Sequence, residues 1–431
     1  MRKYNKYPVY KDSSAQWIGS IPKEWQALRI GSMFRERREK VSDKDFKPLS
    51  VTKKGIVPQL DNAAKSNDGD NRKGVRKGDF VINSRSDRKG SSGIAYEDGS
   101  VSLINIVMEP HGIVSEFAEY LLKSNNFIEE FYRYGHGIVA DLWTTRFSDM
   151  KGILIPVPSE PEQTAIANFL DKKTAEIKEF IRLKEKTIEL LKERKTAIIN
   201  QAVTKGLNPN VPMRDSGIEW LGEIPKHWEV KKLKYCLKNI TGGGTPSMEN
   251  SNYWSGTIPW ISPKDMKSYV IVESKMHITE MALRNTNVSI LPIGSLLLVV
   301  RSGILQRTLP VCRTGVEATI NQDLKALVPI SNINSEYLYH LLKGCEGAVL
   351  YECVKAIATV ESIEMDYLKN FKLPFAPIDE QGSIVEFIND QTIRFDQSIS
   401  QAQQEIALIK EYQQSLISEA VTGKIDVREL L

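Results

Sequence analysis

The sequence predicts an α+β protein built from two copies of one unit, each a globular mixed α/β lobe followed by a long helix. Three observations predict this class: a tryptophan-containing motif that occurs twice, a buried strand that ends at an Arg-Ser pair in both halves, and a heptad-like helix that closes each half. The repeat places one lobe at 1–155, a helical region with its linker at 156–210, a second lobe at 211–372 and a second helical region at 373–431.

The repeated motif opens each half of the chain. Its copies run over 12–25 and 215–228, and both carry two tryptophans, a glycine and an Ile-Pro pair at the same spacing. Such agreement is improbable by chance. It indicates an internal duplication with a pseudo-twofold relation between the halves.

A strand is expected in the middle of each lobe. Short apolar runs begin at Phe80 and Leu296, each two residues after a glycine, and lead into Arg85-Ser86 and Arg301-Ser302. Runs of this length bounded by turn residues are typical of buried strands. We also expect helices within the lobes, over Glu116–Arg133 and Ser335–Lys343.

Each half ends in a stretch whose apolar residues are spaced alternately four and three apart, which predicts a coiled-coil helix from about Thr164 to Val203 and a second one like it. Polar residues interrupt this seam at Lys184, Lys195 and Gln413. The simplest partner for each helix is the other, although each seam could instead pack on its own lobe. The residues expected to pair the helices are Ile177, Ile181, Ile188, Leu191, Ile198, Phe395, Ile399, Ile406, Ile409 and Leu416.

The composition is that of an ordinary globular protein. The 431 residues are 41% hydrophobic and 26% charged, and the net charge of only +4 excludes a strongly basic nucleic-acid coat. The 4 cysteines form no CxxC pair, which argues against a disulfide framework or a zinc site and favours a reducing cytoplasm. We find no apolar signal-like N-terminus and no run long enough to cross a membrane, so we expect a cytoplasmic protein.

Catalytic signatures are missing from the sequence. The glycine-rich segment 241–246 lacks the lysine of a phosphate-binding loop, and the 5 histidines show no metal-ligand spacing. Asp265-Met266-Lys267 could be half of a nuclease site, but a loop or a helix start is the simpler interpretation. We therefore expect no catalytic residues, no metal and no cofactor in this chain.

Positive charge gathers in the first lobe. Between residues 71 and 90 the sequence has seven basic and two acidic side chains. Lysine and arginine can neutralise phosphates, whereas arginine forks and small polar side chains read base edges. A solvated surface loop is the plainer alternative. The candidate DNA-binding residues of this lobe are Lys53, Lys54, Asn83, Ser84, Arg85, Ser86, Arg88 and Lys89.

The second lobe has fewer charges but repeats the Arg-Ser pair. Its glycine-rich segment would allow close approach of a ligand to the backbone, and Lys264 could meet a phosphate. Its tryptophans are better explained as core residues. The candidate DNA-binding residues here are Gly244, Thr245, Lys264, Arg301, Ser302, Gln306 and Arg307.

Together these motifs resemble those of specificity subunits of type I restriction-modification systems. The resemblance rests on the motif at 215–228 with its copy at 12–25, on Gly243-Gly244-Thr245-Pro246 with Ile258-Pro259-Trp260-Ile261, and on a proline followed by Glu-Gln before each long helix, Pro156 with Glu162-Gln163 and Pro374 with Glu380-Gln381. It covers nearly the whole chain. The first lobe departs from the pattern because it lacks a Gly-Gly-Thr-Pro segment.

The resemblance implies a DNA-binding subunit with two target recognition domains, each reading one half of a bipartite, asymmetric DNA sequence. It implies that the two helices pack antiparallel and set the spacer between the halves. The implied partners are double-stranded DNA, two modification subunits that bind S-adenosylmethionine and methylate adenine, and two restriction subunits that use ATP and Mg²⁺. The specificity subunit itself is noncatalytic in such systems.

Two other interpretations compete with this one. The chain could be a coiled-coil scaffold whose lobes bind other proteins without reading DNA, or a self-sufficient nuclease or methyltransferase. The first would show no sequence-selective DNA binding, and the second would act on DNA without partner subunits.

Overall fold

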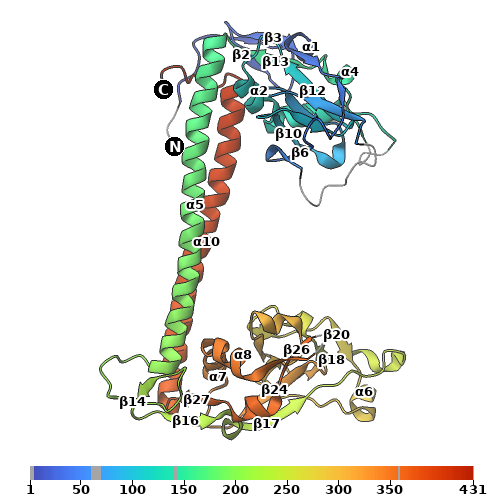
Figure 1. Cartoon of the computed structure of the whole chain (residues 1–431). Coiled ribbons are helices and arrows are strands. Elements are labelled where there is room, and N and C mark those ends of the chain that lie inside the picture. The colour runs from blue at the N-terminus through green and yellow to red at the C-terminus, as the bar shows by residue number, and fades with distance from the viewer. Residues whose placement is uncertain (1–3, 60–68, 139–142, 358–359, 431) are drawn as a thin grey trace. The chain divides into compact units, whose positions relative to one another are not determined.

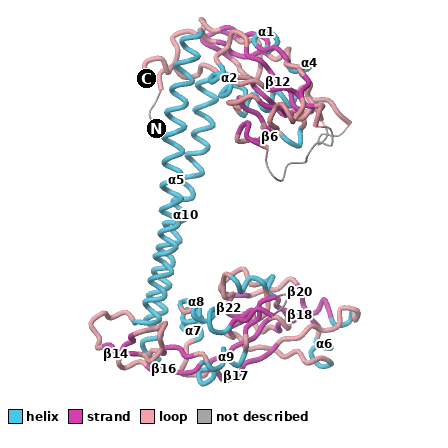
Figure 2. The backbone as a smooth tube through the Cα atoms, viewed as in Figure 1, coloured by secondary structure: helices cyan, strands magenta, loops and turns pink. Residues whose placement is uncertain are grey.

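The structure, a computed structural model, describes residues 4–59, 69–138, 143–357 and 360–430 (Figure 1). The chain forms two compact units: unit 1 comprises Met1–Glu185 with Gln403–Leu431, and unit 2 comprises Lys186–Ala402. Each unit holds one lobe and a part of both long helices. Figure 2 shows that both lobes mix strands with short helices, as the sequence predicts.

Unit 1 is organised around a four-stranded antiparallel sheet in the order β10-β9-β12-β4. Its central strand β9 (Phe80–Asn83) is buried along its whole length, because Phe80 and Ile82 face one core and Val81 faces another. The remaining strands of the lobe are β4 (Phe34–Glu36), β10 (Ser92–Ile94) and β12 (Asn105–Pro110) in this sheet, β5 (Lys40–Val41), β8 (Arg72–Val75) and β11 (Gly99–Val101) in a three-stranded sheet, and the hairpin of β6 (Leu49–Thr52) and β7 (Gly55–Pro58).

Two helices, α2 (Ser115–Leu122) and α3 (Asn125–Arg133), replace the single helix expected over Glu116–Arg133. The helix is interrupted at Ser124, whose hydroxyl accepts a hydrogen bond from the Phe127 N–H at 3.4 Å. A serine in extended backbone at this position caps a new helix, so the prediction of one continuous helix was wrong. The short helices α1 (Ile30–Met33) and α4 (Phe147–Met150) complete the lobe.

Unit 2 has a five-stranded sheet in the order β17-β24-β21-β22-β19. Its strand β21 (Leu296–Val299) is buried at every position and leads into Arg301, as β9 leads into Arg85. The other strands of this lobe are β17 (Leu237–Gly242), β19 (Val270–Ile271), β22 (Val311–Thr314) and β24 (Leu324–Pro329) in the same sheet, β18 (Trp254–Ile261), β20 (Met276–Ile278) and β23 (Thr319–Ile320) in a second sheet, and the hairpin of β25 (Val354–Ile357) and β26 (Val360–Ile363). Its helices are α6 (Glu280–Asn285), α7 (Ser335–Gly344), α8 (Glu346–Cys353) and α9 (Met365–Asn370).

Equivalent strand pairs confirm the internal repeat. The hairpin of β1 (Tyr10–Asp12) and β2 (Ser20–Pro22) in unit 1 has its counterpart in β14 (Met213–Asp215) and β15 (Glu223–Pro225) of unit 2. Likewise, β3 (Gln26–Arg29) pairs with β13 (Leu154–Val157) as β16 (Glu229–Lys232) pairs with β27 (Lys372–Phe375). In each unit, the first hairpin contains most of the duplicated tryptophan motif.

A buried glutamine ties each long helix to its lobe. Gln163 accepts a hydrogen bond from the Val114 N–H at 2.8 Å and donates one to the Pro158 carbonyl at 3.0 Å. Gln381 makes the equivalent bonds, with the Asn334 N–H at 2.8 Å and a main-chain carbonyl at 2.9 Å. Because buried main-chain groups need partners, these bonds give a physical reason for the glutamine in the first turns of each long helix.

The long helices are α5 (Glu160–Lys205) and α10 (Ile378–Val421), and they lie side by side within each unit (Figure 1). Lys184 of α5 pairs with Glu405 of α10 in unit 1, and Lys195 pairs with Asp396 in unit 2, an antiparallel order. The ten residues predicted to pair the helices are all buried or half-buried: Ile177, Ile181, Ile188, Leu191 and Ile198 on α5, and Phe395, Ile399, Ile406, Ile409 and Leu416 on α10.

The end of each long helix belongs to the core of one lobe. Leu416 and Ala420 of α10 pack in the main core of unit 1, around Trp25. Val203 of α5 packs in the main core of unit 2, around Trp228. The second tryptophan of the duplicated motif is thus a core residue in both units, with at most 1% of its surface exposed.

Candidate nucleic-acid interface

In unit 1, β9 ends in a tight turn over 83–89, which we call the Arg85 turn. The Asn83 side-chain oxygen accepts a hydrogen bond from the Arg85 N–H at 3.0 Å, and the Tyr132 hydroxyl donates to the Asn83 carbonyl at 3.1 Å. Arg85 also forms a β-bridge with Thr144, which lies far along the chain. The backbone of the turn is therefore fixed from two neighbouring segments, and its exposed side chains project from a rigid frame.

Two grooves adjoin the Arg85 turn, with volumes of about 650 and 440 Å³. Ile104 and Asn105 line both, so the grooves are neighbours. Acidic side chains are also present, because Asp87 lines the larger groove and Glu36 the smaller. Basic and small polar side chains otherwise dominate the polar lining: Lys53, Arg72, Asn83 and Arg88 in the larger groove, and Arg38, Lys73, Ser84, Arg85 and Arg146 in the smaller.

The structure brings five of the eight residues predicted in this lobe to the grooves, namely Lys53, Asn83, Ser84, Arg85 and Arg88. Ser86 belongs to the Arg85 turn itself. Lys89 instead pairs with Glu129 at 2.6 Å and lies 5.8 Å from the centre of the Tyr132 ring. Lys54 is exposed in the turn between β6 and β7.

Arg146 and Arg38 were not among the predicted DNA-binding residues. Arg146 follows the segment that bridges to Arg85, about sixty positions later in the chain. Nothing local in the sequence marks it, because its place depends on that long-range bridge. Arg38 follows β4, at the edge of the four-stranded sheet, and its guanidinium lies 2.6 Å from Glu36.

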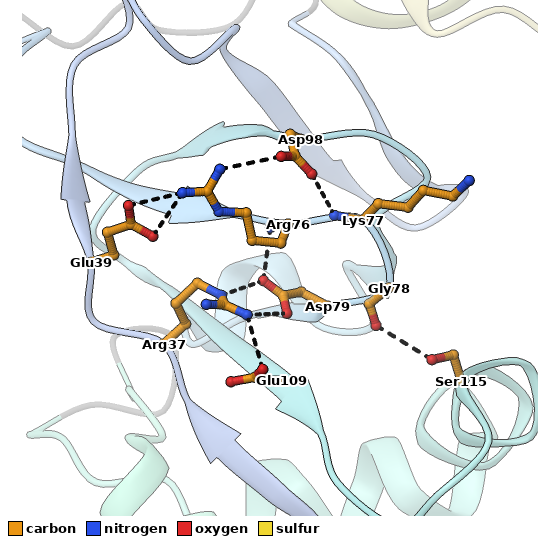
Figure 3. Close-up of polar contacts among 9 residues, drawn as sticks. All are labelled: Arg37, Glu39, Arg76, Lys77, Gly78, Asp79, Asp98, Glu109 and Ser115. Atoms are coloured by element: carbon orange, nitrogen blue, oxygen red, sulfur yellow. Dashed lines mark hydrogen bonds and ion pairs between the residues drawn. The ribbon is translucent and has the colours of Figure 1, made fainter.

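Part of the positive charge predicted to face DNA is used within the lobe (Figure 3). Arg76 pairs with Glu39 at 3.0 Å and with Asp98 at 3.2 Å, and Arg37 pairs with the buried Asp79 at 2.7 Å. The Asp79 carboxylate accepts hydrogen bonds from Arg37 and from the Arg76 main chain, which ties the turn before β9 to its neighbours. The hydrogen bond to Asp79 raises the pKa of Arg37. Both arginines stabilise the fold, and because Arg76 is one of the seven basic residues at 71–90, counting all seven overstated the charge available to DNA.

Unit 2 repeats the turn over 299–307, which we call the Arg301 turn. Arg301 forms a β-bridge with Ser362, the counterpart of the Arg85–Thr144 bridge. The Ile363 N–H donates to the Val300 carbonyl at 2.8 Å, and the Ser302 N–H donates to the Glu361 carbonyl at 3.1 Å. The two turns therefore share a backbone frame in spite of their different sequences.

Four other predicted residues of unit 2 lie in or outside the Arg301 turn. The Ser302 hydroxyl accepts a hydrogen bond from the Ile304 N–H at 3.4 Å, and the Gln306 amide binds Glu361, so both stabilise the Arg301 turn. Arg307 is the last residue of this turn and is exposed. Lys264 is exposed on a separate 3₁₀ turn.

The glycine-rich segment packs closely against its own chain. A Cβ on Gly243 would lie 2.0 Å from the Asn321 carbonyl oxygen. The Gly244 N–H donates to the Ile320 carbonyl at 3.0 Å, and the Gly244 carbonyl accepts from the Trp260 indole at 2.9 Å. The glycines let the end of β17 pack against the segment 320–323, and the close approach of a ligand to this backbone stays a prediction.

This packing brings Thr245 to the same segment as the Arg301 turn. The Thr245 hydroxyl donates to Gln322, while Asp323 binds the Arg301 guanidinium. Two stretches predicted separately, at 244–245 and 301–307, thus meet at 320–323. Asp323 was missed by sequence reasoning, since an acidic residue gives no signal for a DNA-binding surface.

Among the residues that the structure describes, no group of three or more His, Cys, Asp or Glu side chains is placed to hold a metal ion. The described helices include none that is long and apolar enough to cross a membrane. All 4 cysteines are buried and free, and burial raises the pKa of the Cys236 and Cys312 thiols to about 11.

Comparison with known proteins gives a consistent result. A family model for the type I restriction modification DNA specificity domain matches residues 225–408. The chain is 33% identical over 258 residues to the specificity subunit of the type I restriction enzyme EcoR124I/EcoR124II of Escherichia coli. It is also 33% identical over 172 residues to the MjaIX specificity subunit of Methanocaldococcus jannaschii. These matches span 57% and 39% of each relative's length and the same shares of this chain.

Solved structures are similar to almost the whole chain. A chain from a study of complex assembly and conformational transition in the type I R-M system has a TM-score of 0.72 at 16% identity, covering 94% of this chain and 99% of that one. The HsdS subunit from Thermoanaerobacter tengcongensis has a TM-score of 0.59 at 17% identity, covering 94% and 98%. At these identities the likeness concerns the fold.

Proposed function

We propose that the chain is a specificity subunit of a type I restriction-modification system and that it reads a bipartite, asymmetric DNA sequence, one half-site with each lobe. The observation that carries the proposal is the pair of equivalent turns at Arg85 and Arg301, which share a backbone frame and differ in their surroundings. Because the two turns share a backbone frame but carry different side chains around it, the two lobes can recognise two different base sequences.

We propose that α5 and α10 set the spacer between the half-sites and dock the partner subunits. In each unit, the start of one long helix and the end of the other pack on the lobe, and we call this contact the joint. The two joints would offer similar surfaces to two identical modification subunits. Those subunits would bind S-adenosylmethionine and methylate adenine, and two restriction subunits would supply ATP- and Mg²⁺-dependent cleavage. This chain would contribute recognition and assembly, and no chemical step.

Mapping methylated adenines in cells tests the proposal. The chain and its modification subunit would be produced in a host without adenine methylation, and the methylated sites would define the recognised sequence. We expect Arg85→Ala to relax or abolish the requirement for one half-site and Arg301→Ala that for the other. Arg284→Ala removes an exposed arginine of α6, outside both turns, and is the control for loss of charge.

Three outcomes would contradict this function. If either arginine variant affected both half-sites equally, one lobe would not read one half-site. If no bipartite methylated sequence appeared and gel shifts with the modification subunit showed no sequence selectivity, the scaffold interpretation would be favoured. If the purified chain alone cleaved or methylated DNA given Mg²⁺ and S-adenosylmethionine, the noncatalytic assignment would be wrong.

A further inference from the structure

We infer that Asp323 is a positioning residue that presents the Arg301 guanidinium to a guanine in the half-site of unit 2. The inference rests on the proposed function and deepens it, because it names one base and the residues that select it. The geometry that points to it is a chain of three polar side chains, Asn321, Asp323 and Arg301.

The Asp323 carboxylate is held on two sides. Its Oδ1 atom lies 2.8 Å from Arg301 Nε and 2.6 Å from Arg301 Nη2. Its Oδ2 atom accepts a hydrogen bond from the Asn321 amide at 3.1 Å, and the Asp323 N–H donates to the Asn321 side-chain oxygen at 3.1 Å. Because Asn321 is only 6% exposed, it forms a buried support behind the carboxylate.

The backbones of the two charged residues are joined as well. The Val300 N–H, next to Arg301, donates to the Asp323 carbonyl at 2.9 Å. Arg301 itself is held by its β-bridge with Ser362. The arginine and the aspartate are therefore fixed relative to each other at both the main chain and the side chain, which reduces the conformational entropy that Arg301 would lose on binding.

The contacts with Asp323 leave one edge of the guanidinium available. A guanidinium has five N–H donors, and Asp323 takes one from Nε and one from Nη2. The donors that remain lie on the Nη1–Nη2 edge and form a fork, on a side chain that is 56% exposed. Guanine presents two acceptors side by side in the major groove, whereas adenine presents one acceptor and one donor. A fork of donors therefore favours guanine.

Unit 1 provides an internal comparison. The Ser84 N–H donates to the Ile104 carbonyl at 3.3 Å, as the Val300 N–H donates to the Asp323 carbonyl, so Ile104 occupies the position of Asp323. Within the described part of the chain, Arg85 has no carboxylate partner within ion-pair distance. The Arg85 guanidinium thus lacks this support, and we expect its base preference to be weaker than that of Arg301.

Methylation mapping with the complex of this chain and its modification subunit tests the inference. In the half-site lost in Arg301→Ala, the wild-type map should contain a G·C pair required over other pairs by about tenfold or more. Asp323→Ala should remove most of this preference at that one position and leave the other half-site unchanged. Asp323→Asn, which keeps an oxygen acceptor, should retain part of it.

Two further variants separate positioning from a merely structural effect. Arg301→Lys keeps the charge but loses the fork, so it should lose the same G·C preference. This variant also gives a result if Asp323→Ala fails to fold. Asp366→Ala removes another carboxylate of unit 2, which lies 3.8 Å from Lys369 and is 94% exposed, and should change nothing.

The outcomes distinguish this inference from the proposed function. If no bipartite sequence is methylated, the proposed function itself fails. The inference alone is overturned if the sequence is bipartite but the unit 2 half-site lacks a required G·C pair, or if Arg301→Lys keeps that preference. It is also overturned if Asp323→Ala weakens methylation of all sequences equally, since that would indicate a phosphate contact or loss of structure.

Discussion

Unit 1 and unit 2 share the backbone arrangement of the Arg85 and Arg301 turns but differ in the side chains that surround the two arginines. The Arg85 and Arg301 turns each follow a fully buried strand and form a β-bridge to a later segment. Around Arg85 the surface is grooved and basic, whereas Arg301 is held by the Asp323 carboxylate. Main-chain hydrogen bonds hold the frame in both units, so the side chains around it were able to diverge after the duplication.

The joints of the two units differ in the segments that connect the long helix to the tryptophan motif. In unit 2 the chain runs directly from α5 through Gly206 into the tryptophan motif. In unit 1 the same joint is made by both ends of the chain, and the Asp426 N–H donates to the Asn5 carbonyl at 2.8 Å. The Gly423 region after α10 therefore takes the place that the Gly206 region has in unit 2. Substitutions at matched positions can show how far the two joints are equivalent.

The largest effect is expected at the buried tryptophans. Trp25→Ala and Trp228→Ala should each lower the free energy of unfolding by about 3–5 kcal/mol, because each leaves a large cavity. Calorimetric unfolding of the full chain would measure both losses.

Phenylalanine variants sharpen this comparison of the tryptophans. The Trp228 indole N–H donates to Glu380 at 2.9 Å, whereas the Trp25 indole N–H has no partner among the described residues. Trp228→Phe should therefore cost about 1–2 kcal/mol more than Trp25→Phe. Equal losses would mean that the Glu380 bond contributes nothing, and that the two joints are energetically alike.

The next largest loss of stability is expected at the glycines that follow the long helices. Gly206 and Gly423 have φ angles of 77° and 71°, so alanine at either costs about 1 kcal/mol. A Cβ on Gly423 would lie 2.4 Å from Pro22 Cδ, while one on Gly206 would lie 3.3 Å from Trp228 Cζ2. Gly423→Ala should therefore cost about 3 kcal/mol in total, because overpacking adds to the backbone strain.

Thermal unfolding of both variants tests the difference between the two joints. Gly347→Ala is the control, since a Cβ there meets no atom within 4 Å and its backbone is helical. This variant should be neutral or slightly stabilising. A smaller loss for Gly423→Ala than for Gly206→Ala would show that the joint made by the two chain ends is the looser one.

The fold was largely predictable because periodicity and repetition report local structure and burial. The two motif copies, the strands before Arg85 and Arg301 and the helix seams all appear in the pattern of apolar residues. The break at Ser124 was missed, since one polar residue in an apolar pattern is a weak sign of a cap.

The candidate site was less predictable because it depends on long-range pairing of charges. Arg76 looked available for DNA, yet Glu39 and Asp98 neutralise it from distant parts of the sequence. Asp323 looked unsuited to a DNA surface until the fold placed it against Arg301. Ion pairs between distant residues leave no periodic pattern in the sequence. The composition therefore gives the number of charged residues but does not show which of them pair.

A smaller and equal effect is expected at the two buried glutamines. Gln163→Ala and Gln381→Ala each leave a buried N–H and a buried carbonyl without their partner, which should cost about 1–3 kcal/mol in either unit. Hydrogen exchange should increase at the Val114 amide in the first variant and at the Asn334 amide in the second. Exchange that increased in both units with a single variant would contradict the independence of the two joints.

The smallest effect is expected where the two helices exchange charges. Lys184 lies 2.5 Å from Glu405 in unit 1 and Lys195 lies 2.8 Å from Asp396 in unit 2, but both pairs remain partly exposed. Exposed ion pairs are screened by solvent and salt, so Lys184→Ala and Lys195→Ala should each change the free energy of unfolding by less than about 0.5 kcal/mol. Both lysines interrupt the apolar seam, and leucine at either position should instead stabilise the helix pair. Denaturation at low and high salt separates the two contributions: the loss with alanine should vanish at high salt, whereas the gain with leucine should persist. A leucine variant less stable than the wild type at both salt concentrations would mean that these lysines specify the helix register through their acidic partners, and that the apolar seam alone does not hold the helices together.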